Sequence, residues 1–168
     1  MSERTDFYME GREFLAEPYH YFESGLDTIY LLNGVSETTT DYGPMVHIDN
    51  INGLHRAIGL HIVEKEEPMS GPEFRFLRKQ MGLSQAELAK DLGVSDQTVA
   101  NYEKENTRLG PADALMRACY LLAVLPADTR VEAVKSVLRP APRMRKRLPD
   151  VPRRRLVERW AERSLQAA

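Results

Sequence analysis

One short segment constrains the fold most, because it predicts two short helices joined by a tight turn. Ser84-Gln-Ala-Glu87 has the form of a capping box, in which a Ser side chain and a Glu three residues later bond the free N–H groups at a helix start. Gly93 ends this helix, since glycine takes the left-handed conformation at low cost. Ser95 can cap a second helix over about residues 96–104. Two short helices joined by a tight glycine turn form a helix-turn-helix motif.

A third helix is predicted just before this motif. Ser70-Gly-Pro-Glu73 repeats the capping-box form, and its proline lies in the first turn, where it costs no helical hydrogen bond. Phe74, Leu77 and Met81 then follow at the spacing of one helical face. Helical patterning continues up to Pro126, which marks the end of the helical segment.

The exposed side of the helix predicted over residues 96–104 is polar, whereas Val99 points inward with Val94. Its polar side chains include the amides of Gln97 and Asn101. Such amides can pair bidentately with N6 and N7 of adenine, and a helix of about three turns fits a major groove about 12 Å wide. The second helix of the motif contacts bases, so the pattern predicts DNA binding. A three-helix bundle without a role in DNA binding is the alternative.

The stretch LSQAELAKDLGVSDQTVANYEK resembles the Cro/repressor-type helix-turn-helix, also called the xenobiotic-response-element family. The resemblance covers about residues 68–125 and implies a mostly α fold with a lambda-repressor-like bundle. It also implies that Gln85 touches a phosphate and that Gln97 and Asn101 reach base edges. The family often has a glycine where this chain has Glu105-Asn106, although Asn tolerates left-handed geometry. The residues expected at DNA are Gln85, Ser95, Asp96, Gln97, Thr98, Asn101, Lys104 and Arg108.

Charge is distributed unevenly along the 168 residues, although the formal net charge is only −2. Residues 1–127 hold 11 Lys/Arg and 20 Asp/Glu, whereas residues 128–168 hold 12 and 5. The predicted recognition helix is nearly neutral, while affinity for DNA comes mostly from phosphate contacts. Cations are therefore needed close to it. The candidates are Arg75, Arg78, Lys79, Lys90, Lys104 and Arg108.

Residues 127–168 are predicted to form a basic extension. A helical run over Asp128–Leu138 precedes an Arg- and Pro-rich stretch, and a last helical run over Leu156–Leu165 carries the only tryptophan, Trp160. The basic stretch can act as an arm that adds affinity for DNA, or it can bind an acidic partner or the acidic N-terminal half. Both interpretations stay open. Its cations are Arg143, Arg145, Lys146, Arg147, Arg153, Arg154 and Arg155.

The first 67 residues predict a flexible leader over 1–17 and a small α+β unit over 18–67. The spacing of apolar residues by three and four favours a helix over about residues 51–66, on which Ile51, Leu54 and Ile58 share one face. Strand-forming residues bounded by glycine and asparagine favour short strands before it. The strand candidates are Tyr19–Glu23, Thr28–Leu32 and Met45–Ile48.

The stretches YHYFESGLDTIYLLNG and INGLHRAIGLHIVEKEEPMSGPEFRFLRKQMGLSQ are similar to the MqsA-type antitoxin and regulator proteins. That resemblance implies a bacterial, autoregulating DNA-binding protein, with a toxin as a possible partner. Members of the family often hold zinc through paired Cys-x-x-Cys motifs. This chain has one cysteine, Cys119, so the resemblance implies neither a zinc site nor another metal here.

Other classes of protein are disfavoured by the sequence. No apolar stretch is long enough for a transmembrane helix, the N-terminal residues do not resemble a secretory signal, and the single thiol fits a reducing cytoplasm. The four histidines lack metal-binding spacing, and no nucleophile with a base is visible, so neither a cofactor nor an enzymatic activity is expected. The histidines are His20, His47, His55 and His61.

The sequence thus predicts a sequence-specific transcription regulator, a repressor that binds a palindromic operator in double-stranded DNA. A homodimer is expected, because two recognition helices about 34 Å apart gain specificity over one. The dimer surface is expected on Leu115–Leu125 or on Asp128–Leu138. The alternative is an antitoxin whose N-terminal unit binds a toxin protein and whose DNA binding serves autoregulation.

Overall fold

The computed structural model describes residues 4–104, 108–138 and 159–163. These residues fall into two compact units. Unit 1 holds residues 4–57 together with 159–163, and unit 2 holds the described residues from 58 to 138. This division differs from the predicted boundaries at residues 67 and 126. Residues 58–67 and 127–138 belong to unit 2, and residues 159–163 join the N-terminal unit.

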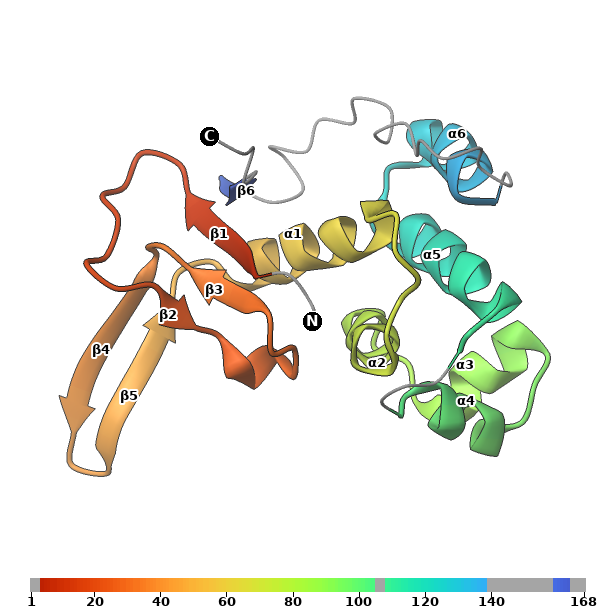
Figure 1. The fold of residues 1–168 in the computed structure, drawn as a ribbon, viewed down its shortest axis with the longest axis horizontal. Helices are drawn as coiled ribbons and strands as arrows, with labels where there is room; N and C mark the ends of the chain where they lie inside the picture. The colour runs from red at the N-terminus through yellow and green to blue at the C-terminus, as the bar shows by residue number, and fades with distance from the viewer. Residues whose placement is uncertain (1–3, 105–107, 139–158, 164–168) are drawn as a thin grey trace. The chain divides into compact units, whose positions relative to one another are not determined.

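Within the described residues, unit 1 is built on a four-stranded sheet in the order β2-β3-β1-β6 (Figure 1). Strand β1 pairs in parallel with β3, while the β2–β3 and β1–β6 pairings are antiparallel. A separate antiparallel ribbon of β4 (Val35–Thr40) and β5 (Gly43–Ile48) follows β3 in the chain. The sheet strands are β1 (Thr5–Met9), β2 (Tyr19–His20), β3 (Ile29–Leu31) and β6 (Trp160–Arg163), and a short 3-10 helix, η1 (Phe22–Ser24), follows β2.

One face of this sheet carries the core of unit 1. Side chains alternate between the faces of a strand, so Phe7 on β1 and Ile29 and Leu31 on β3 are buried on the same side. Trp160 on β6 is buried opposite Met9 and completes the apolar face. Residues from both ends of the chain are therefore needed to form this core.

Two predictions about the chain ends were wrong. The flexible leader expected over residues 1–17 contains β1, which long-range pairing with β3 and β6 holds in an extended conformation. Residues 160–163 of the helix expected over Leu156–Leu165 form the strand β6, because β1 offers these residues an edge to pair with. The remaining residues of that run lie outside the described part.

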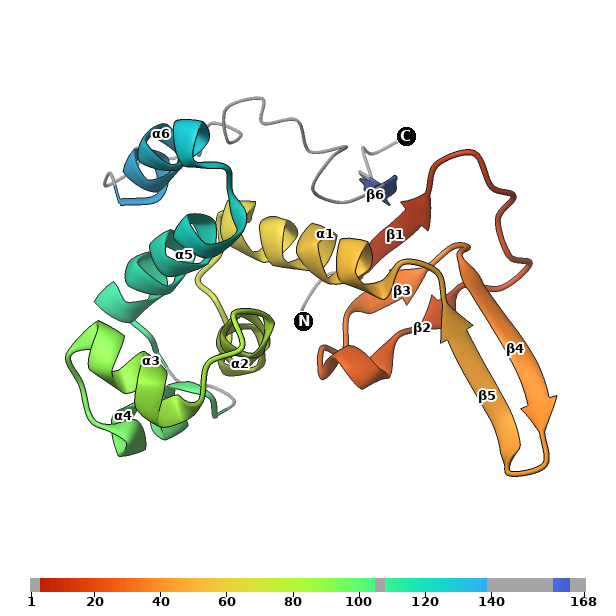
Figure 2. The ribbon, with the colours of Figure 1, turned by 180° about the vertical axis from the view of Figure 1, so that it is seen from behind.

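Unit 2 is helical in its described part (Figure 2). Helix α1 (Ile51–Glu64) contributes its second half to this unit. Apolar side chains of α2, α3, α4 and α5 are fully buried, among them Leu77, Leu88, Val99 and Met116. The further helices are α2 (Gly71–Gln80), α3 (Gln85–Leu92), α4 (Asp96–Tyr102), α5 (Pro111–Val124) and α6 (Ala127–Leu138).

Arg117 on α5 holds the end of α1 in unit 2. Its side chain is fully buried, and its guanidinium donates to the main-chain carbonyls of Ile62, Val63, Lys65 and Glu67 at 2.7–3.0 Å. The last carbonyls of a helix have no partner within the helix, and this side chain satisfies two of them, those of Ile62 and Val63, together with two carbonyls of the loop that follows. A 2.5 Å ion pair between Nε and Asp113 balances its charge.

Several predicted elements agree with the structure, including the helix near residues 51–66, the helix over Asp128–Leu138 and the strand over Met45–Ile48. Tyr19–Glu23 is a strand only in its first two residues, after which η1 begins. Strand β4 was not predicted. The basic cluster from Arg143 to Arg155 and the pair Glu105-Asn106 lie outside the described residues.

Candidate nucleic-acid interface

Three serines fix where the helices of the motif begin. Ser70 and Ser84 each accept a hydrogen bond from the main chain three residues later, and the glutamates at those positions bond back, so both predicted capping boxes are formed. Ser95 caps α4 in the same way, with Thr98 donating its main-chain N–H. The hydrogen bonds that Glu87 accepts from Ser84, chiefly the one from the Ser84 side chain, also lower the pKa of Glu87.

The turn between α3 and α4 forms as the sequence predicts. Gly93 ends α3 in the left-handed conformation, with φ of 68°, and the main-chain N–H of Val94 then bonds back to Ala89 at 2.9 Å. The buried side chains of Leu88 and Val99 lie in the bundle core. Figure 1 shows α3 and α4 side by side, which is the arrangement of a helix-turn-helix.

A polar network ties α2 to the residue that follows α4. The Glu103 carboxylate accepts hydrogen bonds from Arg78 Nε at 2.5 Å, from Arg78 Nη2 at 3.1 Å and from Gln85 Nε2 at 2.9 Å. Arg78 also donates to the main-chain carbonyl of Leu83 at 2.6 Å. Arg78 and Glu103 are almost fully buried, with 10% and 6% of their side chains exposed. The network therefore fixes the end of α4 against α2 and α3.

Opposing effects set the ionisation of Glu103. Burial by itself raises its pKa, but hydrogen bonds from Arg78 and Gln85 and the positive charges of Arg78 and Arg75 outweigh that effect. The pKa is therefore lowered below its ordinary value, and the carboxylate stays ionised at neutral pH.

Two close contacts add to this positioning of α4. The rings of Phe74 on α2 and Tyr102 on α4 meet edge to face, with 5.6 Å between their centroids. Gly71 at the start of α2 lies so close to the main chain of Lys104 that a Cβ there would be 2.1 Å from the carbonyl oxygen. Only glycine fits this contact, so the sequence at the start of α2 is coupled to the position of the chain that follows α4.

Half of the predicted site residues lie on α4. Asp96, Gln97 and Asn101 are exposed, while Thr98 is half-buried beside its cap. Gln97 Nε2 donates to Asn101 Oδ1 at 3.4 Å, and Lys104 Nζ donates to the same oxygen at 2.7 Å. Two amides and one ammonium group thus form a connected row along a solvent-facing helix.

The remaining predicted residues differ in their exposure. Ser95 and Arg108 are exposed, whereas Gln85 is half-buried and bonded to Glu103. Among the candidate phosphate-binding cations, Arg75, Lys79, Lys90 and Lys104 are exposed. Arg78 is not, because it is buried in the pair with Glu103, so the expectation that it meets phosphate was wrong.

Sequence reasoning missed the role of Glu103, although a signal was present. Arg78 adjoins Leu77 and follows Phe74 by four residues, which places it on the apolar side of α2. A charged residue on an apolar helix face needs a partner of opposite charge. The pattern could therefore have indicated a buried ion pair, but not which acid supplies it.

Two other kinds of site, for a metal ion and for a membrane, are not found in the described residues. They contain no group of three or more His, Cys, Asp or Glu side chains placed to hold a metal ion. None of the helices in the described part combines the length and the apolar character needed to span a bilayer.

Comparison with known proteins supports the class of this site. Residues 74–115 match a family model described as helix-turn-helix. They include most of α2, all of α3 and α4, and the start of α5. Searches of curated proteins and of solved structures gave no match. Residues 74–115 are thus similar to the helix-turn-helix domains of DNA-binding transcription regulators. The match supports the resemblance to Cro/repressor-type proteins and does not extend to the MqsA type.

Proposed function

We propose that this chain is a sequence-specific transcription regulator, a repressor that binds a palindromic operator as a homodimer and inserts α4 into the major groove. The observation that carries the proposal is the exposed row of Gln97 and Asn101 on a capped helix whose end the Glu103 network holds. Gln and Asn are the side chains best suited to pair with adenine. Asp96 and Thr98 flank them at the first turn of α4.

Affinity in this proposal comes from cations outside the recognition helix. Lys79 on α2 and Lys90 on α3 are exposed, as are Lys104 and Arg108 after α4. Each contact between such a cation and a phosphate releases a counterion, so binding weakens steeply as salt is raised. Gln85 supports the site through Glu103 and lies at the start of α3, where a phosphate contact is expected.

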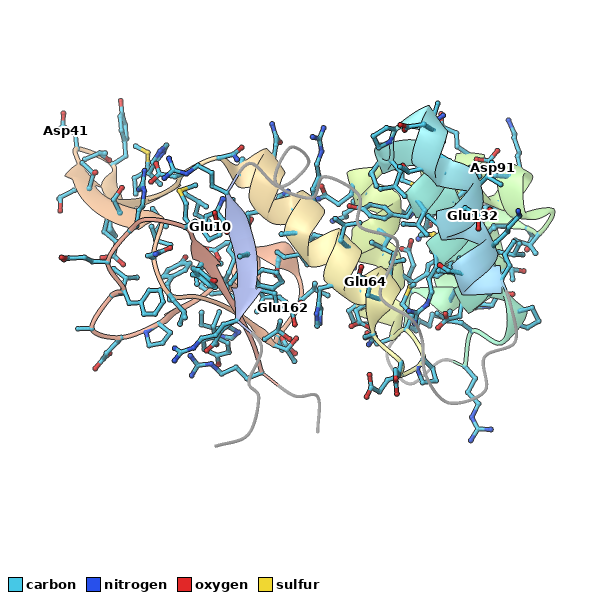
Figure 3. The ribbon with its side chains drawn as sticks, turned by 90° about the horizontal axis from the view of Figure 1, so that it is seen from above. Glu10, Asp41, Glu64, Asp91, Glu132 and Glu162 are labelled. Carbon is cyan, nitrogen blue, oxygen red and sulfur yellow. The ribbon has the colours of Figure 1, made fainter. Side chains whose placement is uncertain are left out.

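The proposed dimer contact lies on α5 and α6. In the described part of unit 2, the large apolar side chains that remain well exposed all lie on these two helices, and none lies on α2, α3 or α4. On α6, Val131 and Leu138 are 61% and 49% exposed and lie seven residues apart on one face. Figure 3 shows α6 with Glu132 labelled on it. The other exposed apolar residues are Leu115 and Leu122.

The test is to sequence DNA fragments bound by the purified full chain and then to measure affinity for the enriched site. Replacing Gln97 and Asn101 together by Ala should reduce specific binding by at least about tenfold, since each good bidentate pair contributes about 1–3 kcal/mol of discrimination. Asn52→Ala is the matched control, because Asn52 is an exposed amide on α1. Unchanged affinity of the double variant for the enriched site contradicts the assignment of α4.

A protein-binding antitoxin is the second candidate, and unit 1 is the observation that favours it. Unit 1 has its own core and exposes the aromatic side chains of Phe14, Phe22 and Tyr42. Aromatic residues are enriched at protein interfaces. Co-purification with the product of a neighbouring toxin-like gene would support this role, and Phe22→Ser should then weaken the complex without changing operator affinity.

A further inference from the structure

The β4–β5 ribbon pairs with no other strand in the described part of unit 1, and its two strands hold each other along their whole length. None of residues 35–48 is buried, and the Tyr42 side chain at the turn is fully exposed. A two-stranded hairpin by itself is only marginally stable in water, and a third strand stabilises it. The ribbon is therefore an element that can gain from a further strand.

Pro44 decides which main-chain groups of the ribbon face outward. Opposite residues of an antiparallel pair alternate between pairs that exchange two N–H···O bonds and pairs that exchange none. Pro44 has no N–H, so its pair with Thr39 is of the second kind. In such pairs the N–H and C=O groups point away from the partner strand, toward the outer edges of the ribbon. The pairs of this kind are Thr39 with Pro44, Glu37 with Val46, and Val35 with Ile48.

The two outer edges of the ribbon differ. On β5, Pro44 offers no N–H at the edge, and proline at such a position protects a strand against further pairing. On β4, Val35, Glu37 and Thr39 each keep an outward N–H and C=O, and no described residue bonds to these groups. Glu37 and Thr39 are exposed, and in the view of Figure 1 β4 lies on the side of the ribbon away from β2 and β3. Strand β4 therefore carries the open edge.

The charge of the ribbon limits what can pair with this edge. The acidic side chains of residues 35–48 are Glu37 and Asp41, and the segment has no Lys or Arg. Figure 3 labels Asp41, which lies at the turn. Like charges that face each other across strands are destabilising, whereas opposite charges contribute favourably. A second copy of the ribbon would bring more carboxylates and DNA would bring phosphates, so an extended protein segment that carries Lys or Arg fits this edge best.

We propose that the outer edge of β4 binds an extended, Lys- or Arg-bearing segment of another protein, which pairs as a third strand with Val35, Glu37 and Thr39. In strand addition, main-chain hydrogen bonds supply affinity and side-chain contacts supply specificity. Here the specificity comes from Glu37, whose carboxylate meets a cation of the added strand. The proposal concerns unit 1 alone. It does not rest on operator binding, and it does not require that the partner be a toxin.

Peptide binding to the full chain tests this edge. The probe is a short, fluorescently labelled peptide of alternating Thr and Val with Lys at its centre and ends, and its anisotropy is followed as the purified chain is added. The same peptide with Glu in place of each Lys is the control probe. We expect the Lys peptide to bind and the Glu peptide to bind several-fold more weakly. Glu37→Lys should reverse that preference, because the facing charges then change from opposite to like.

A second variant tests the main chain rather than the charge. Thr39→Pro removes the outward N–H of residue 39 but no hydrogen bond within the ribbon, because residue 39 donates none to β5. It should weaken binding of the Lys peptide about two- to tenfold, which is the effect of one lost hydrogen bond. Thr39→Ala keeps the N–H and should bind as the wild type does. Emission from the buried Trp160 checks that both variants keep the core of unit 1.

The proposal is overturned if the Lys and Glu peptides bind equally, if neither binds, or if Thr39→Pro binds the Lys peptide as tightly as Thr39→Ala does. A dimer of the chain that Thr39→Pro dissociates would overturn it too, since a second copy would then occupy the edge. No DNA is present in these measurements, so their outcome is separate from that of operator binding.

Discussion

Replacing Glu103 by Ala removes the centre of the polar network that holds the end of α4. Its carboxylate accepts three hydrogen bonds, two from Arg78 and one from Gln85, and lies 3.9 Å from Arg75 Nε. After the substitution, the Arg78 guanidinium stays buried but has lost its ion pair with Glu103. Within this network it keeps one hydrogen bond, to the Leu83 carbonyl. Breaking one side of a buried ion pair costs about 3–5 kcal/mol.

We expect unit 2 to lose about 3 kcal/mol in its free energy of unfolding. For a domain of this size, that loss lowers the melting temperature by roughly 12–24 °C. The two units can be followed separately, because Trp160 is the only tryptophan and lies in unit 1, whereas α2–α6 lie in unit 2. Far-ultraviolet circular dichroism should therefore show the shift, while the transition followed by Trp160 fluorescence should stay in place.

Glu132→Ala is the matched control for this substitution. Glu132 also lies in an ion pair, 2.9 Å from Lys135 Nζ, but the two side chains are 68% and 54% exposed. Exposed pairs contribute about 0–1 kcal/mol, so this change should hardly move the circular dichroism transition. The reasoning about burial fails if Glu103→Ala destabilises unit 2 by no more than the control does, or if the Trp160 transition moves equally.

Two further predictions concern the packing of Trp160 in unit 1 and the effect of acid. Gly34→Ala should shift Trp160 emission to longer wavelength, because a Cβ at Gly34 would lie 2.8 Å from the Trp160 ring. Gly25→Ala is the control, since Gly25 has a similar φ of +77° but nothing within 4 Å of its Cβ position. Equal emission spectra for the two variants would contradict the packing of Trp160 against Gly34. Because the pKa of Glu103 is lowered in the folded state, its stabilisation is complete above its ordinary value of 4.5 and is lost as pH falls through the lowered one. The stability difference between the wild type and Glu103→Gln should therefore be constant above about pH 5 and should shrink in acid, as urea unfolding at a series of pH values can measure.

The helix-turn-helix was predictable because its signals are local. Ser84 with Glu87, Gly93 and Ser95 each act within a few residues, and every one of these caps and turns forms in the structure. The exposed positions of Gln97 and Asn101 also follow from helical spacing once Val99 is taken as buried. Their roles in DNA binding remain predictions.

The parts that sequence reasoning missed depend on residues far apart in the chain. Strand β1 begins with the polar residues Thr5 and Asp6, and its extended conformation comes from pairing with β3 and β6. Apolar residues around Trp160 are spaced as in a helix. Residues 160–163 nevertheless form a strand, because they pair with the edge of β1 and because the Trp160 ring packs against Gly34. Local propensity gives way to such pairing, and no local signal reveals the partner.

The hydrogen bonds of α4 show how specificity and affinity are linked in the proposed complex. Asn101 Oδ1 already accepts from Lys104 Nζ at 2.7 Å and from Gln97 Nε2 at 3.4 Å. To accept from adenine N6, this oxygen must exchange at least one of these donors, which offsets part of the gain from the base pair. In the proposed complex we expect the longer bond, from Gln97, to be the one exchanged. That exchange frees the Gln97 amide for a neighbouring base, while Lys104 continues to hold the Asn101 side chain in place.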